Sequence, residues 1–175
     1  MKDIHFSLII INKRNFKNNI IYLIIFIFIF AADRFSKLYI LNLAEMNDTL
    51  NLYITSFLNF YLIWNKGIAF GLFSFDKNVI YTSITFLIIF ITLIILILAI
   101  RSNDYKGYFF IIIFSGSMGN LYDRLYYSAV PDFIDLHINN YHWFIFNVAD
   151  IFITIGVICL ILDELFSYKK TNEIK

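Results

Sequence analysis

The stretch FNVAD, residues 146–150, decides how the rest of the chain is interpreted. It begins within an apolar run from Trp143 to Leu162, which is long enough to cross a bilayer because a spanning helix needs ~20 apolar residues. Asn147 and Asp150 lie inside this run. An ionised carboxylate near the membrane centre costs at least ~2.5–3.5 kcal/mol, so an acid at such a position predicts a functional role.

Composition supports a membrane protein. The chain has 175 residues, of which 60% are hydrophobic and 20% aromatic, whereas soluble domains average roughly 45–50% apolar residues. The net charge of +1 gives no basic surface for nucleic acid, so no nucleic-acid partner is expected. The single cysteine, Cys159, can form no intrachain disulfide.

The apolar segments predict an all-α membrane protein with one integral membrane domain over residues 1–175. Four transmembrane helices are expected at about 20–39, 79–100, 107–126 and 143–166. The segment 42–75 is too long for a turn and too interrupted for a helix. Its aromatic and β-branched stretch LYITSFLNFYLIWN, residues 52–65, predicts short strands on the extracytoplasmic membrane surface, between the first two helices.

Lysine and arginine in the short loops predict the orientation of the chain. One side of the membrane would carry Lys2, Lys13, Arg14, Lys17, Arg101, Lys106, Lys169, Lys170 and Lys175. The other side would carry only Arg34, Lys37, Lys66, Lys77 and Arg124. Both termini are therefore expected in the cytoplasm, and the unusual polar residues fall toward the outer face.

Charged residues at this outer face allow a structural interpretation. Asp33 would pair with Lys37, and Asp123 would pair with either Arg124 or Arg34, so that ion pairs hold the helices together. Pairing does not account for every acid, however. The stretch 123–150 contains four acids against one basic residue, Arg124.

The surplus acids suggest a different chemistry for Asp132 and Asp150. Two carboxyl groups held together in a low dielectric separate their apparent pKa values, so that one keeps a proton. Aspartic proteases use this arrangement: one carboxylate takes a proton from water while the other carboxyl polarises the scissile carbonyl. The acid pair is the best candidate for catalysis in the sequence.

Other catalytic and binding motifs are absent from the sequence. It has no HExxH zinc-protease motif, no GxSxG elbow and no phosphate-binding loop. His137 and His142 lack a familiar metal-ligand spacing and are expected to be loop or interface residues, so neither a metal nor a cofactor is predicted. Gly67, in NKGIAFG, suits a position of close backbone approach or of positive φ.

Five short motifs in order resemble those of the lipoprotein signal peptidase (signal peptidase II) family. They span about Asp33 to Gly156 and comprise DRFSK (33–37), NKGIAFG (65–71), GNLYDRL (119–125), VPDFID (130–135) and FNVAD (146–150). Each motif alone is weakly specific, but five in sequence on a chain with four expected spans are highly specific. Pro131 precedes Asp132 where the family usually has another apolar residue.

The resemblance implies that Asp132 and Asp150 form the catalytic pair. Supporting or substrate-contacting roles are expected for Asn65, Gly67, Asn120, Asp123, Arg124, Asn147, Asp33 and Lys37. It further implies a bacterial cytoplasmic-membrane endopeptidase whose site faces the extracytoplasmic side. Its partners would be membrane lipid and prolipoproteins, cut before a cysteine that carries diacylglycerol, with no metal or cofactor.

A small membrane transporter or channel component is the alternative, because such proteins also keep acids inside their spans. A transporter needs a polar path across the whole bilayer. The expected span 79–100 is apolar apart from threonine and serine, and the cytoplasmic halves of the first and fourth spans are apolar as well. The sequence therefore favours the peptidase.

Overall fold

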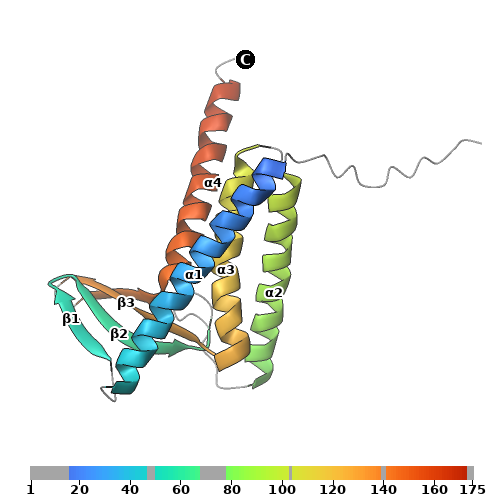
Figure 1. Ribbon diagram of the computed structural model, residues 1–175. Coiled ribbons are helices and arrows are strands. Elements are labelled where there is room, and N and C mark those ends of the chain that lie inside the picture. Colours follow the sequence, from blue (N-terminus) through green and yellow to red (C-terminus); the bar gives the residue numbers. More distant parts are fainter. Residues whose placement is uncertain (1–15, 47–49, 68–77, 103, 139–140, 173–175) are drawn as a thin grey trace, which may run out of the picture.

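The computed structural model describes residues 16–46, 50–67, 78–102, 104–138 and 141–172. Four helices dominate it, and a small antiparallel sheet lies at one end of them (Figure 1). In chain order the elements are α1 (Phe16–Met46), β1 (Asn51–Thr55), β2 (Leu58–Asn65), α2 (Asn78–Arg101), α3 (Lys106–Tyr127), β3 (Val130–Ile138), β4 (Tyr141–Phe146) and α4 (Val148–Asn172). The sheet has the strand order β1-β2-β3-β4.

Helix α3 is the central helix, since α1, α2 and α4 all pack against it. Two glycines of α3 allow the close contacts. A Cβ atom at Gly116 would lie 2.6 Å from the carbonyl oxygen of Ala149 in α4, and one at Gly119 would lie 2.5 Å from Oδ2 of Asp33 in α1. Small residues at such contacts are typical of helix packing in membranes.

Two described helical stretches, Asn18–Met46 and Val79–Arg101, are long and apolar enough to cross a membrane. Less than a fifth of the apolar part of each stretch is buried within the chain, whereas the core helix of a soluble protein is mostly buried. Large apolar side chains such as Phe28 and Phe86 point outward from them. Exposed apolar surface of this extent is expected to face lipid.

The predicted β-rich segment 42–75 is confirmed in its middle and wrong at its start. Strands β1 and β2 lie within it, but α1 continues to Met46, beyond the expected end of the first span. Residues 47–49 and 68–75 of the segment lie outside the described residues. Ile40 of α1 packs with Leu50 and Phe133, which fixes the sheet against the end of α1.

The expected span 143–166 is wrong at its beginning. Residues Tyr141–Phe146 form β4, which pairs with β3 through Ile134↔Phe146 and His137↔His142, and α4 begins only at Val148. Half of the sheet therefore comes from the connection between α3 and α4, and not from the segment between the first two helices alone. An apolar run by itself does not separate a strand from the helix that follows it.

Asn147 and Asp150 form a reciprocal cap at the start of α4. The backbone N–H of Asp150 donates to Oδ1 of Asn147 at 3.2 Å, and the backbone N–H of Asn147 donates to Oδ2 of Asp150 at 3.2 Å. This is the capping-box pattern, in which two otherwise unpaired N–H groups are satisfied. The sequence placed Asp150 well inside a spanning helix. In the structure it lies in the first turn of α4.

Candidate active site

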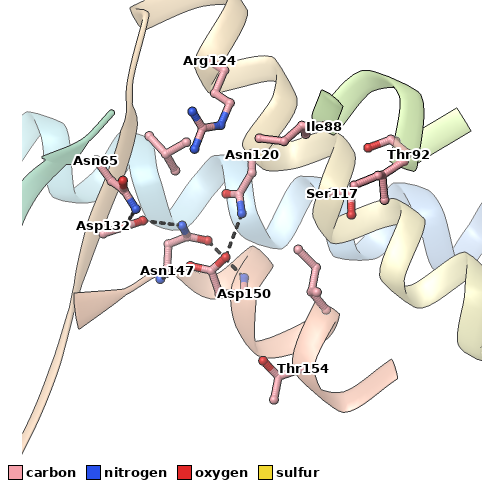
Figure 2. A pocket seen from close by; sticks show the side chains of 13 residues that line it. Asn65, Ile88, Thr92, Ser117, Asn120, Arg124, Asp132, Asn147, Asp150 and Thr154 are labelled. Carbon is pink, nitrogen blue, oxygen red and sulfur yellow. Dashed lines mark hydrogen bonds between the residues drawn. The ribbon is translucent and has the colours of Figure 1, made fainter. Parts of the chain in front are cut away.

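Asp132 lies on β3 and is almost fully buried. Its Oδ1 accepts a hydrogen bond from Nδ2 of Asn147 at 2.6 Å, and its Oδ2 accepts one from Nδ2 of Asn65 at 2.8 Å (Figure 2). Asn65 ends β2, where it pairs with Val130 of β3. Strand pairing therefore brings an amide from the first half of the chain to an acid of the second half.

Asp150 lies on the other side of Asn147 and is 6% exposed. Nδ2 of Asn120, from α3, donates to its Oδ1 at 2.8 Å, and the cap described above occupies Oδ2. Asn147 contacts both acids, through its side-chain amide on Asp132 and its backbone N–H on Asp150. Neutral donors thus hold the two carboxyl groups in one site, one on either side of Asn147.

Burial, together with the negative charge of Asp150, raises the pKa of Asp132 to about 7. Hydrogen bonds from Asn147 and Asn65 oppose this shift because they favour the ionised form. A carboxyl group with a pKa near neutrality can hold or release a proton under ordinary conditions. That property suits acid–base chemistry.

Both acids line a pocket that combines polar and apolar walls (Figure 2). The polar residues that line it are Asn65, Thr92, Ser117, Asn120, Arg124, Asp132, Asn147, Asp150 and Thr154. The apolar wall comes from α2, β3 and α4 and consists of Ile88, Ile91, Val130 and Ile153. The sequence predicts α2 as a plain span, apolar apart from threonine and serine. Thr85 and Thr92, seven positions apart and both buried, mark the inward face of this helix.

A buried cluster of four charged residues lies behind the pocket. Nζ of Lys37 is 2.8 Å from Oδ1 of Asp33 and 2.7 Å from Oδ2 of Asp123. Arg34 donates to both oxygens of Asp123, at 2.5 and 2.7 Å, and to Asp33 at 2.8 Å. The pairing of Asp33 with Lys37 is confirmed, and the open choice for Asp123 is resolved in favour of Arg34.

This cluster is linked to the acids through two further contacts. Lys37 donates to Oδ1 of Asn120 at 2.9 Å, and Asn120 in turn donates to Asp150. Oδ1 of Asp33 accepts the backbone N–H of Ala149 at 3.1 Å, next to Asp150 in the first turn of α4. Asp33, Lys37 and Asp123 do not line the pocket, so their contacts position other groups.

Arg124 bonds to the backbone of the NKG segment rather than to Asp123. Its guanidinium donates to the carbonyl oxygen of Gly67, while the N–H of Gly67 donates to Oδ1 of Asn65 at 2.8 Å. The hydroxyl of Tyr81, in α2, donates to the carbonyl oxygen of Arg124 at 2.8 Å. These bonds hold Asn65 in place beside Asp132, and the role of Tyr81 has no motif in the sequence that would have revealed it.

Comparison with known proteins identifies the family. The family model described as signal peptidase (SPase) II matches residues 25–166. The chain belongs to the signal peptidase II family. It is 58% identical, over 93% of its length and 98% of the relative, to a lipoprotein signal peptidase of Pelagibacter ubique (strain HTCC1062). It is 42% identical to that of Aquifex aeolicus (strain VF5), over 84% of this chain and 87% of the relative.

Solved structures agree with this assignment to signal peptidase II. A bacterial membrane enzyme solved at 2.3 Å resolution by the in meso method has a TM-score of 0.67 and 28% identity, covering 85% of this chain and 90% of its own. The protein is accordingly a membrane-embedded protease that removes signal peptides from prolipoproteins. The comparisons give no support to the alternative of a transporter or channel component.

The contact of Asn65 with Asp132 leads to a first prediction. Asn65→Ala removes one of the two amide donors to Asp132 and the acceptor of the Gly67 N–H. A hydrogen bond to a charged group contributes about 1.5–3 kcal/mol, so kcat/KM for prolipoprotein cleavage should fall about 10- to 100-fold. Asn51→Ala, on the exposed edge strand β1, is the matched control and should leave the rate unchanged. Equal rates for the two variants would contradict a role for Asn65.

Proposed function

We propose that this peptidase is an aspartic endopeptidase in which Asp132 and Asp150 share one proton. The observation that carries the proposal is how the two buried acids are bonded. Among the described residues, the hydrogen bonds to both carboxyl groups come from asparagine amides and one backbone N–H, and no lysine or arginine forms an ion pair with either acid. Neutral donors orient the two acids but do not force both of them to be ionised, so one can keep a proton.

In the reaction, the ionised member of the pair takes a proton from a water molecule, and the resulting hydroxide adds to the scissile carbonyl carbon. The protonated member donates its proton to the carbonyl oxygen, giving a tetrahedral diol. Collapse of the diol breaks the C–N bond: the leaving nitrogen takes a proton from the carboxyl that removed it from water, and a diol hydroxyl returns its proton to the other carboxylate as the C=O bond re-forms. The pair then holds one shared proton again. Asn65, Asn120 and Asn147 keep both acids oriented throughout.

The substrate class fits the two kinds of wall in the pocket. The polar end, at Asn65 and Arg124, offers donors and acceptors to an extended peptide backbone, which needs partners at membrane depth. The isoleucines of α2 and α4 offer an apolar wall for the diacylglyceryl group on the cysteine that follows the cleaved bond. We place the cut before that cysteine.

The proposal extends to the membrane topology. All four helices would span the bilayer, with α4 starting at Val148, and both termini would lie in the cytoplasm. Two observations support it. One is the distribution of lysine and arginine along the chain. The other is the position of the sheet at one end of the helices (Figure 1), because Asp132 lies on β3 of that sheet and Asp150 lies in the first turn of α4, which follows β4. Acids at that end can meet a substrate on the extracytoplasmic side.

Cleavage by purified protein tests the proposal directly. The protein, in detergent or lipid, is given a prolipoprotein with and without diacylglycerol on its cysteine, and the new N-terminus is identified by mass spectrometry. We expect cleavage before the modified cysteine only, at the same rate with and without EDTA. Loss of activity in EDTA that added zinc restores would replace the acid-pair mechanism with a metal-dependent one.

The raised pKa of Asp132 leads to a second prediction. As the pH rises through about 7, the pair loses its shared proton, so kcat/KM should fall about tenfold per unit at higher pH. Since folding raises this pKa, the contribution of Asp132 to stability is complete at acid pH and is lost as the pH rises through about 7. Cleavage rates between pH 5 and 9 check this, with unfolding measured at each pH. A flat profile from pH 6 to 9 would contradict a shared proton.

A further inference from the structure

A second cluster of titratable side chains lies on the β3–β4 hairpin, outside the pocket of Asp132 and Asp150. It comprises Asp135, His137 and His142, each of which offers one ligand atom, and these atoms all lie within 4.8 Å of one another. Asp135 and His137 are two apart on β3, and His142 pairs with His137 across the hairpin. The expectation that the two histidines are loop residues is wrong, because His137 lies on β3 and His142 on β4, and strand pairing brings them together.

The carboxylate of Asp135 is the centre of the cluster. Nδ1 of His142 lies 2.8 Å from Oδ2 of Asp135, and Nδ1 of His137 lies 3.8 Å from the same oxygen. Ligand atoms that are each about 2.0–2.2 Å from one zinc ion lie about 3–3.5 Å apart. The two distances from Nδ1 to Oδ2 lie just below and just above this range. Small side-chain movements would therefore bring all three atoms within bonding distance of one ion.

Two buried polar atoms without partners distinguish this cluster from an ordinary Asp–His pair. The side chain of His137 is 9% exposed, and its Nδ1 forms no hydrogen bond within the described part of the chain. Asn59, directly opposite Asp135 on β2, also has a buried Oδ1 without a partner there. Buried polar atoms are normally satisfied, so two orphans around one carboxylate indicate a missing ligand.

The donor set selects the kind of ligand. Two imidazole nitrogens with one carboxylate oxygen suit zinc, whereas calcium and magnesium prefer oxygen ligands alone. His142 is 56% exposed, so an ion can enter from solvent. The rings of His137 and His142 stack at 5.2 Å between centroids with their Nδ1 atoms near the same carboxylate, as two ligands of one ion require.

We propose that Asp135, His137 and His142 form a zinc-binding site that clamps β3 to β4, with Asn59 or water in the fourth position. The site is structural, because the acids of the peptidase pocket are bonded to other residues: Asp132 to Asn65 and Asn147, and Asp150 to Asn120. Zinc would stabilise the hairpin that carries Asp132 and leads to Asn147. Peptide cleavage itself would not depend on it.

Zinc titration of the whole protein, purified without a polyhistidine tag and stripped with chelator, tests the proposal. Calorimetry should show one zinc per chain, and zinc at 100 times Kd should raise Tm by about 5 °C or more. His142→Ala should weaken binding at least tenfold and abolish the Tm shift. His5→Ala, which removes the remaining histidine of the chain, is the matched control and should bind zinc as the unaltered protein does.

The peptidase activity shows whether the variants are folded, because zinc removal and His142→Ala should both leave turnover at 25 °C unchanged. Cobalt added to the unaltered protein provides a readout that needs no variant, namely visible absorption bands of a nitrogen- and oxygen-bound ion. Absence of these bands would overturn the site, as would a Tm unaffected by zinc. Equal zinc affinity in His142→Ala and the unaltered protein would mean adventitious binding elsewhere and would also overturn it.

Discussion

Replacing either Asp132 or Asp150 with asparagine is expected to lower kcat for prolipoprotein cleavage about 1,000-fold or more. An amide can neither take the proton from water nor donate one to the carbonyl oxygen, and each of these steps contributes about 10²–10⁴-fold. Asparagine has nearly the same shape as aspartate, and its carbonyl oxygen can still accept one of the hydrogen bonds that each acid receives. Cleavage kinetics with purified variants measure the effect.

The protein must stay folded for this result to bear on catalysis. Thermal unfolding and membrane insertion of both variants should match those of the unaltered protein within a few degrees. Glu164→Gln, which removes an exposed acid from α4 at a distance from the pocket, is the matched control and should cleave at the normal rate. Turnover within tenfold of normal in either aspartate variant, with folding intact, would refute the acid pair.

Lys37→Met is expected to cause the largest loss of stability. Lys37 is 1% exposed and lies between Asp33 and Asp123. Its removal leaves two buried carboxylates with Arg34 as their only basic partner among the described residues, and breaking a buried pair costs about 3–5 kcal/mol. Tm should fall by about 10 °C, measured by thermal unfolding in detergent.

Activity should also fall in this variant, because Asn120 loses the donor that fixes its side-chain oxygen while its amide holds Asp150. Lys106→Met is the matched control. Lys106 also pairs with two acids, Asp163 and Glu164, but it is about one third exposed, and such pairs contribute at most about 1 kcal/mol. Equal Tm losses in the two lysine variants would show that the buried cluster contributes no more than a surface pair.

The sequence predicts which residues gather at the site, and the structure supplies their bonding. The surplus of acids between residues 123 and 150, together with the five motifs, predicts Asp132 and Asp150 as the catalytic pair. This prediction was possible because proton transfer depends on the carboxyl group, which the sequence shows directly. The partner of Asp123 is Arg34 because α1 packs on α3. The positions of Arg34 and Arg124 in the sequence do not reveal this packing.

The hairpin of β3 and β4 was the main element that the sequence did not predict. Residues 141–146, YHWFIF, form a strand but are mostly apolar, like the helix that follows. A prediction based on apolar length alone therefore started the helix too early, at residue 143. The helix start was nevertheless encoded: Asn147, three positions before Asp150, is a side-chain cap followed by an acid at the third helical position. This cap signal predicts a helix start at Val148 and so leaves residues 141–146, His142 among them, outside the helix.

The capping of α4 by Asn147 and Asp150 bears on when the enzyme becomes active during its synthesis. Asp150 acquires its bonded position only when the first turn of α4 forms, and α4 is the last element of the described chain. A nascent chain complete only as far as β3 therefore holds Asn65, Asn120 and Asp132 but no second acid in place. On the proposed acid-pair mechanism, proteolytic competence arrives only when α4 folds, so a chain truncated before α4 is expected to be inactive.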